Sequence, residues 1–129
     1  MAKIKQLTIA LENRPGAVAE IAKTLGNAKV NILALSGTAP MGQTGFLQLV
    51  VEDTRRAKKA LDEAKFPYQE ATAEEYELPN KPGALAQYLE KLAAKGLRLS
   101  SIHATASKGG KKAVVVHTID TDAKAATAV

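Results

Sequence analysis

The sequence predicts an α+β fold in which one β-α-β-β-α-β unit occurs twice in tandem. Two observations support this prediction: an internal repeat at an offset of 67 residues, and short β-prone runs that alternate with helical apolar spacing inside each copy. The composition is globular, with 46% hydrophobic and 24% charged residues among 129. Aromatic residues make up only 4%, so Ala, Val, Ile and Leu must form most of the core.

The repeat is clearest in an Asn-x-Pro-Gly-Ala motif. Residues 13–19 read Asn-Arg-Pro-Gly-Ala-Val-Ala, and residues 80–86 read Asn-Lys-Pro-Gly-Ala-Leu-Ala. The same offset, taken without a gap, aligns Leu25 with Leu92 and continues until Asp53-Thr54 meets Asp120-Thr121. Because Pro, Gly and the apolar positions keep register together, we interpret the chain as a duplication.

Each element of the first copy follows from local pattern. Residues 4–11 are short, apolar and β-prone, which predicts strand one. From Ala17 to Leu25 the apolar residues follow the i, i+3, i+4, i+7 spacing of an amphipathic helix. Strand two is expected at 30–35, a Gly-containing turn at 41–45, strand three at 46–51 and strand four at 66–72. Between strands three and four we expect a second helix that is capped by Asp53 or Thr54. Its inward-facing residues are Ala57, Ala60, Leu61 and Ala64. This order is the ferredoxin-like split βαβ, an antiparallel sheet with both helices on one face.

The second copy is shorter than the first. We expect domain one at 1–71 and domain two at 72–129, where the end of the second helix and the fourth strand are missing. With the usual strand order 4-1-3-2, this loss leaves the first strand of copy two, about 73–78, as an open edge. Joining the copies through their second strands would require the short link to cross roughly 29 Å. We therefore predict edge pairing between chains, or strand exchange, and hence a homodimer or higher homo-oligomer.

The Asn-x-Pro-Gly corner between strand one and the helix has a clear local chemistry. Asn is a favoured N-cap, Pro suits the first helical turn, and Gly leaves the backbone open to a ligand. Free N–H groups and the positive helix end favour an anion such as a carboxylate. The same residues are also ordinary helix-starting residues, so one corner alone has both interpretations.

Residues 11–21 with 29–35, and residues 78–86 with 96–102, resemble the opening of ACT domains, and the chain is similar to stand-alone tandem ACT proteins. The resemblance implies a regulatory module that binds an amino acid at the interface between paired domains, with the corner of one domain facing the second strand of its neighbour. The implied contacts are Asn13, Arg14, Pro15, Gly16, Ala17, Val18, Asn31, Ile32 and Leu33, and in the second copy Asn80, Pro82, Gly83, Ala84, Leu85, Leu99 and Ser100. Asn31 aligns with Arg98, so the two sites differ in ligand or one is silent.

The sequence offers little support for catalysis or metal binding. The absence of Cys removes disulfides, thiolate catalysis and Cys-based metal sites. The two histidines, His103 and His117, align with Ser36 and Val50 of copy one, and no carboxylate is clearly placed beside them. We therefore expect a structural role for both, no enzyme activity, no metal and no cofactor.

The net charge of +5 is weak evidence for a polyanion partner, because both halves of the chain contain positively and negatively charged residues. We interpret the charged residues mainly as a solvated surface. An RNA-binding sheet needs exposed aromatic residues on its central strands, and only Phe46 is available. We expect no nucleic acid and no membrane partner, and a cytoplasmic protein. The alternative left open is a regulatory subunit that docks on a separate metabolic enzyme without binding a ligand itself.

Overall fold

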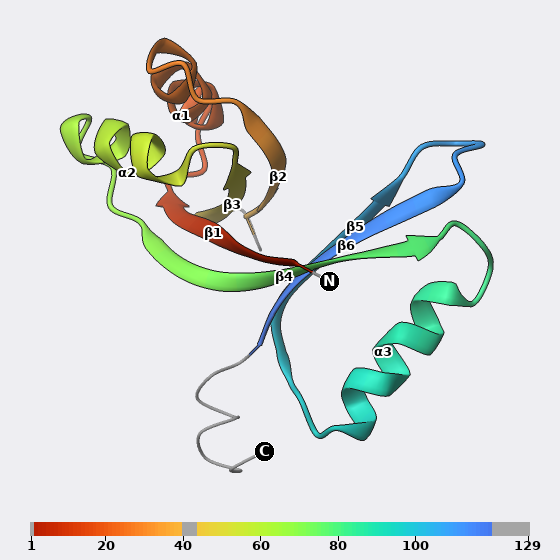
Figure 1. Ribbon diagram of the computed structural model, residues 1–129. Coiled ribbons are helices and arrows are strands. Elements are labelled where there is room, and N and C mark those ends of the chain that lie inside the picture. The colour runs from red at the N-terminus through yellow and green to blue at the C-terminus, as the bar shows by residue number, and fades with distance from the viewer. Residues whose placement is uncertain (1, 40–43, 120–129) are drawn as a thin grey trace. The chain divides into compact units, whose positions relative to one another are not determined.

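A computed structural model describes residues 2–39 and 44–119 (Figure 1). The chain divides into two compact units, of which the first is Lys5–Ala71 and the second combines the first four residues with the chain from Thr72 onward. The expected turn at 41–45 lies mostly outside the described residues. Within the described ranges, no helix has both the length and the apolar character needed to cross a membrane.

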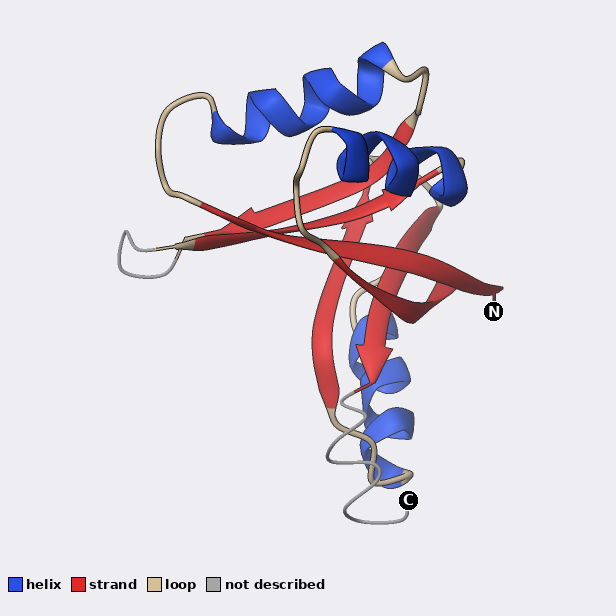
Figure 2. Cartoon of the chain, turned by 90° about the vertical axis from the view of Figure 1, so that its left-hand side faces the viewer, coloured by secondary structure: helices blue, strands red, loops and turns tan. Residues whose placement is uncertain are grey.

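The first unit has the predicted β-α-β-β-α-β order. Its elements are β1 (Ala2–Leu11), α1 (Ala17–Asn27), β2 (Ile32–Thr38), β3 (Gly45–Val51), α2 (Thr54–Glu63) and the start of β4 (Gln69–Pro79). β3 pairs antiparallel with β1 on one side and β2 on the other, so β3 lies between them. Figure 2 shows α1 and α2 together on one side of these strands, as the sequence predicts.

The core of the first unit lies between this sheet and its two helices. Leu7 is opposite Leu49 and Ile9 is opposite Leu47, and all four side chains are buried. The rest of the cluster comes from both helices and the strand ends: Ile21, Leu25, Val30, Val51, Ala57, Ala60 and Leu61. Burying one such Leu or Ile side chain contributes about 1.5–3 kcal/mol, so this face holds the unit together.

The second helix of the first unit begins as predicted. The Asp53 side chain accepts a hydrogen bond from the Arg56 N–H at 3.0 Å and is the N-cap of α2. Ala60 and Leu61 are buried, as expected. The inward position predicted for Ala64 is wrong, because Ala64 is the C-cap residue at which α2 ends, and it is exposed.

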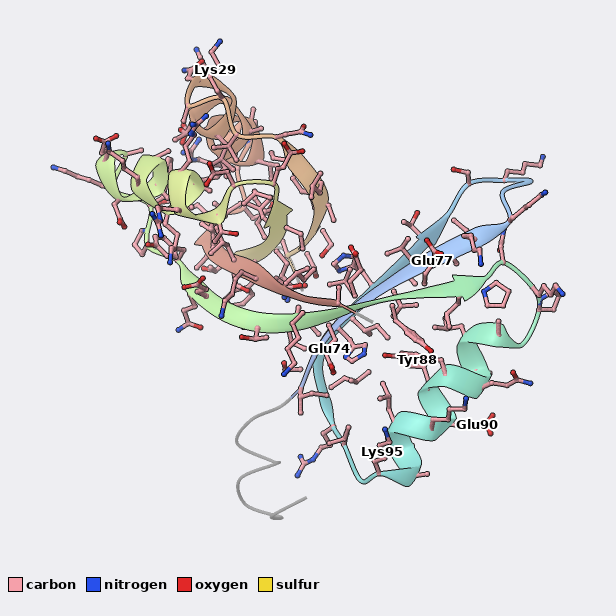
Figure 3. The ribbon with its side chains drawn as sticks, in the orientation of Figure 1. Lys29, Glu74, Glu77, Tyr88, Glu90 and Lys95 are labelled. Carbon is pink, nitrogen blue, oxygen red and sulfur yellow. The ribbon has the colours of Figure 1, made fainter. Side chains whose placement is uncertain are left out.

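The second unit has a shorter set of elements. β4 pairs antiparallel with β6 (Lys112–Ile119), and β6 pairs antiparallel with β5 (Leu99–Ala106). α3 (Ala84–Ala94) supplies Leu92 and Tyr88 to the space beside this sheet, and Figure 3 shows Tyr88 pointing from α3 toward the strands. The second helix expected in this copy begins near residue 121, which lies outside the described residues.

The open edge predicted for residues 73–78 is wrong. In the strand order β4 lies between β1 and β6, and the first four residues of the chain belong to the second unit. The start of β1 therefore occupies the place of the missing fourth strand, and Ala73 is fully buried. Within the described residues, the strands at the ends of the order are β2 and β5, the second strand of each copy.

The gap-free alignment of the two copies is wrong in the third strand. Leu11 faces Gly45 in the first unit, whereas its equivalent Leu78 faces Ala113 in the second, an offset of one additional residue. The β5–β6 turn is thus one residue longer than the β2–β3 turn. As a consequence His117 is equivalent to Leu49, not Val50, which places a histidine at a core position.

Candidate functional site

Each Asn-x-Pro-Gly motif forms a tight turn before its helix. The Ala17 N–H donates to the Arg14 carbonyl at 3.3 Å, and Gly16 has φ 85° and ψ −6°. Pro at the second position and left-handed Gly at the third are the signature of a type II β-turn. The second motif repeats this geometry, with φ 86° at Gly83.

The N-cap role predicted for Asn is therefore wrong. The N-cap residues are Gly16 and Gly83, and neither helix start has a side-chain cap. The Asn80 amide instead donates to the Gly110 carbonyl at 2.8 Å and ties the corner to the β5–β6 turn. One helical N–H at each corner, that of Ala17 or its counterpart in α3, is already used by the turn.

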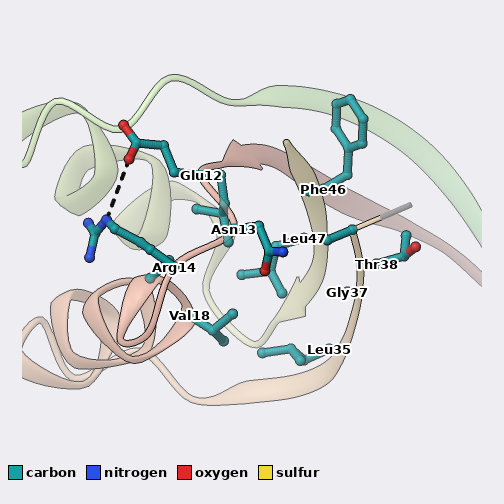
Figure 4. Close-up of a pocket in the computed structure, with 13 residues that line it drawn as sticks. Glu12, Asn13, Arg14, Val18, Leu35, Gly37, Thr38, Phe46 and Leu47 are labelled. Atoms are coloured by element: carbon teal, nitrogen blue, oxygen red, sulfur yellow. Dashed lines mark ion pairs between the residues drawn. The ribbon is translucent and has the colours of Figure 1, made fainter. Parts of the chain in front are cut away.

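A pocket of about 360 Å³ opens beside the first corner. Figure 4 shows Val18 from α1 and Leu35 from β2 pointing toward each other, with the Asn13 side chain near them. The two apolar side chains are 43% and 45% exposed and together leave an apolar surface for a ligand to cover. The full lining is Leu11, Glu12, Asn13, Arg14, Ala17, Val18, Leu35, Gly37, Thr38, Ala39, Gly45, Phe46 and Leu47.

Arg14, the cation of the first corner, is already paired within the corner itself. One guanidinium nitrogen of Arg14 lies 3.0 Å from both carboxylate oxygens of Glu20, and the Arg14 Nε lies 3.7 Å from Glu12 (Figure 4). Arg14 is thus shared between two carboxylates. An incoming anion would have to compete with both for its guanidinium.

A second pocket, of about 240 Å³, lies at the equivalent corner of the second unit. Its lining is Leu78, Pro79, Asn80, Lys81, Leu85, Ala104, Thr105, Ala106, Ala113 and Val115. Most of these positions correspond to the first pocket after the one-residue correction in the third strand. The duplication has therefore preserved a pocket as well as a helix start.

The pockets contain part of the predicted contact set. Of the first corner they include Asn13, Arg14, Ala17 and Val18, and of the second Asn80 and Leu85. The predicted residues that line neither pocket are Pro15, Gly16, Asn31, Ile32, Leu33, Pro82, Gly83, Ala84, Leu99 and Ser100. The Asn31 amide lies 3.5 Å from a Glu52 carboxylate oxygen, and Ser100 bonds Thr118, so both have local partners.

Sequence reasoning missed the wall formed by the end of the second strand. Residues 37–39 line the first pocket together with Leu35, and their equivalents 104–106 line the second. The signal was present in the sequence, because Thr38-Ala39 recurs as Thr105-Ala106 in the repeat.

The two histidines cannot share a metal ion. His103 is opposite Val116, and Ile102 is opposite His117, so the imidazoles project from opposite faces of the β5–β6 pair. His117 is fully buried, and its Nε2 lies 2.5 Å from the Tyr88 hydroxyl, while its Nδ1 has no hydrogen-bond partner among the described residues. Burial lowers the pKa of His117 below its usual 6.5, and the Glu74 carboxylate opposes that shift. In the described part of the chain, no group of three His, Cys, Asp or Glu is arranged to hold a metal.

A family model described as an ACT domain pair matches residues 2–129. The chain belongs to the ACT domain-pair family. No curated protein sequence matches it. Among solved structures, this ACT pair is similar to a protein from Bacteroides thetaiotaomicron, with 29% identity, a TM-score of 0.83, and coverage of 98% of this chain and 90% of that one.

Two more distant structures have the same fold as this ACT pair. The ligand-free regulatory subunit of aspartate kinase from Thermus thermophilus is 15% identical with a TM-score of 0.67, covering 96% of this chain and 87% of that one. The corresponding subunit from Thermus flavus is 13% identical with a TM-score of 0.66, covering 90% and 82%. The tandem arrangement predicted from the repeat is therefore confirmed as an ACT fold.

Proposed function

We propose that this ACT pair is a regulatory protein, not an enzyme, and that it binds a small molecule, an amino acid, at its corners. The observation that supports this most is the pair of equivalent pockets of about 360 and 240 Å³, one at each duplicated Asn-x-Pro-Gly corner. Each combines exposed apolar side chains with a few polar groups from the turn, as ligand sites do. Regulatory subunits among the similar structures agree with this role.

The proposed ligand contacts come from both partners of a paired arrangement. The corner supplies Asn13 and Val18, or Asn80 and Leu85, and we propose that a neighbouring domain contributes its second strand around residues 31–33 or 99–100. Leu33, at 58% exposure on β2, is an apolar side chain available for such pairing. We propose a homodimer or higher homo-oligomer in the cytoplasm, with a metabolic enzyme as the regulated partner.

A thermal-shift screen of the twenty amino acids tests the proposal. A ligand at 100 times its dissociation constant adds roughly 2.7 kcal/mol to the free energy of unfolding. Val18→Arg and Leu85→Arg place a long charged side chain into each pocket and should remove the shift. Ala19→Arg and Ala86→Arg are matched controls, because these residues are exposed on the same helices and line neither pocket.

The screen also separates the proposal from the docking alternative. If the protein is folded and none of the twenty amino acids raises its unfolding temperature, the result would favour a subunit that only docks on an enzyme. Size exclusion with light scattering tests the oligomer, and a monomer at micromolar concentration would contradict the proposed pairing through second strands.

A further inference from the structure

The two pockets differ in size for a reason that the strand register identifies. Gly37 and Gly45 line the first pocket, and their equivalents in the second are Ala104 and Ala113. Each alanine adds a methyl group to the wall. A Cβ built on Gly37 would lie 3.2 Å from the Leu47 side chain, so this position has little free space. The second pocket is accordingly smaller, at about 240 Å³ against 360 Å³.

The pockets also differ in charge. Arg14 in the first lies between Glu12 and Glu20, which leaves that corner with one more carboxylate than cations. In the second corner Pro79 replaces Glu12 and Gln87 replaces Glu20. Across residues 2–39 and 44–119, no carboxylate forms an ion pair with Lys81.

The turn beside the second corner adds more positive charge. It carries Lys108, Lys111 and Lys112, and the Asn80 N–H donates to the Lys111 carbonyl at 2.9 Å, which fixes the turn at the corner. Only Lys112 has an acidic partner among the described residues, Glu77 at 3.9 Å. The corresponding turn of the first copy, residues 39–44, contains no charged residue. Lys81 lines the pocket, and the three other lysines lie in the adjoining turn, so that lysines there exceed the one paired carboxylate, Glu77, by three.

From these differences we propose that the second pocket takes a small organic dianion, such as a dicarboxylate or an acidic amino acid, whereas the first takes an amino acid with a larger uncharged side chain. This inference rests on the proposed function and assigns a ligand class to each of its two sites. The surplus of lysine ammonium groups at the second corner attracts the second negative charge of the ligand. The methyl groups of Ala104 and Ala113 exclude a larger side chain from this pocket. The excess of one carboxylate over cations at the first corner repels a dianion instead.

Amide NMR titrations of the full chain at pH 7.5 test the inference, because the two corners report through different residues. Succinate should shift the amides of residues 83–85 at about fivefold lower concentration than those of residues 16–18, the change expected for an exposed ion pair. L-phenylalanine should shift the amides of residues 16–18 first. Sodium chloride at equal ionic strength is the control for simple screening.

Matched variants assign each preference to its cause. Lys81→Gln, in the turn before α3, should weaken succinate binding at the second corner by up to about fivefold, while Lys91→Gln, exposed on α3 and outside the pocket, should leave it unchanged. Gly37→Ala should weaken phenylalanine binding at the first corner. Gly26→Ala adds the same methyl group to open space in α1 and should have no effect.

Three results would overturn the inference: equal shifts at both corners with succinate, equal shifts at both corners with phenylalanine, or the same shifts with sodium chloride. Any of these is compatible with amino-acid binding at both sites and leaves the proposed function standing. If no amino acid shifts the amide signals of either corner, the proposed function itself is contradicted. Failure of the inference and failure of the proposed function are therefore distinguishable.

Discussion

Acidification should destabilise the second unit before the first, because His117 is a buried histidine without a full set of partners. Its Nε2 is hydrogen-bonded to the Tyr88 hydroxyl at 2.5 Å, and its Nδ1 has no partner within residues 2–39 and 44–119. The groups that face it are Glu74 on β4, the Tyr76 ring stacked on Tyr88, and Tyr88 itself. Protonation would place a charged imidazolium in this core with one N–H unsatisfied.

The magnitude follows from proton linkage. The folded unit keeps His117 neutral because burial lowers its pKa, whereas the unfolded chain binds a proton with a pKa near 6.5. Between those two values the unfolded state holds the extra proton, so the free energy of unfolding decreases as pH falls. The loss is up to about 1.4 kcal/mol per pH unit, begins near pH 6.5, and ends at the folded-state pKa. Above that window the histidine contributes no pH dependence.

Urea unfolding followed by amide NMR at pH 7.5, 6.5 and 5.5 measures this, because β6 and α3 signals report on the second unit and α1 signals on the first. Most carboxylates stay ionised over this range. In the double variant, His117→Leu introduces the residue that the first copy has at the equivalent Leu49. Tyr88→Phe removes the hydroxyl group that would otherwise lose its partner. The pH dependence of the unfolding free energy of the second unit should then disappear. His117→Leu alone should cost about 1 kcal/mol at pH 7.5, for the unpaired hydroxyl. Two results would refute the reasoning: an equal loss of unfolding free energy at low pH in both units, or a loss in the double variant equal to that in the unchanged protein.

Three further predictions concern stability, each measured as a urea unfolding free energy. Gly16→Ala and Gly83→Ala should each cost about 1–2 kcal/mol, because a side chain at φ near 85° is strained even in open space; no loss at either position would contradict the turn geometry. Leu25→Ala should cost about 2–5 kcal/mol through a core cavity, and the control Lys23→Ala, exposed on the same helix, less than about 0.5. Asp53→Ala should cost about 1 kcal/mol by removing the α2 cap, and an unchanged value would show that its bond to the Arg56 N–H is not stabilising.

The candidate site was partly predictable from sequence. The corner residues Asn13, Val18, Asn80 and Leu85 stand out because Pro and Gly have strong local preferences and the motif occurs twice. The opposite wall at Gly37, and the place of the lysine-rich turn beside the second pocket, could not be assigned in advance. Their position depends on which residue of one strand faces which residue of another.

The sequence by itself determined the duplication, the order of strands and helices, and the apolar face of each, since these depend on period and local preference. Only the tertiary structure decided that the start of β1 takes the place of the missing strand beside β4, and that one residue of slip places His117 where the first copy has Leu49. The physical reason is that strand neighbours and register are set by hydrogen bonds between segments far apart in the chain. A shift of one residue there exchanges the two faces of a strand, although the local sequence pattern is unchanged.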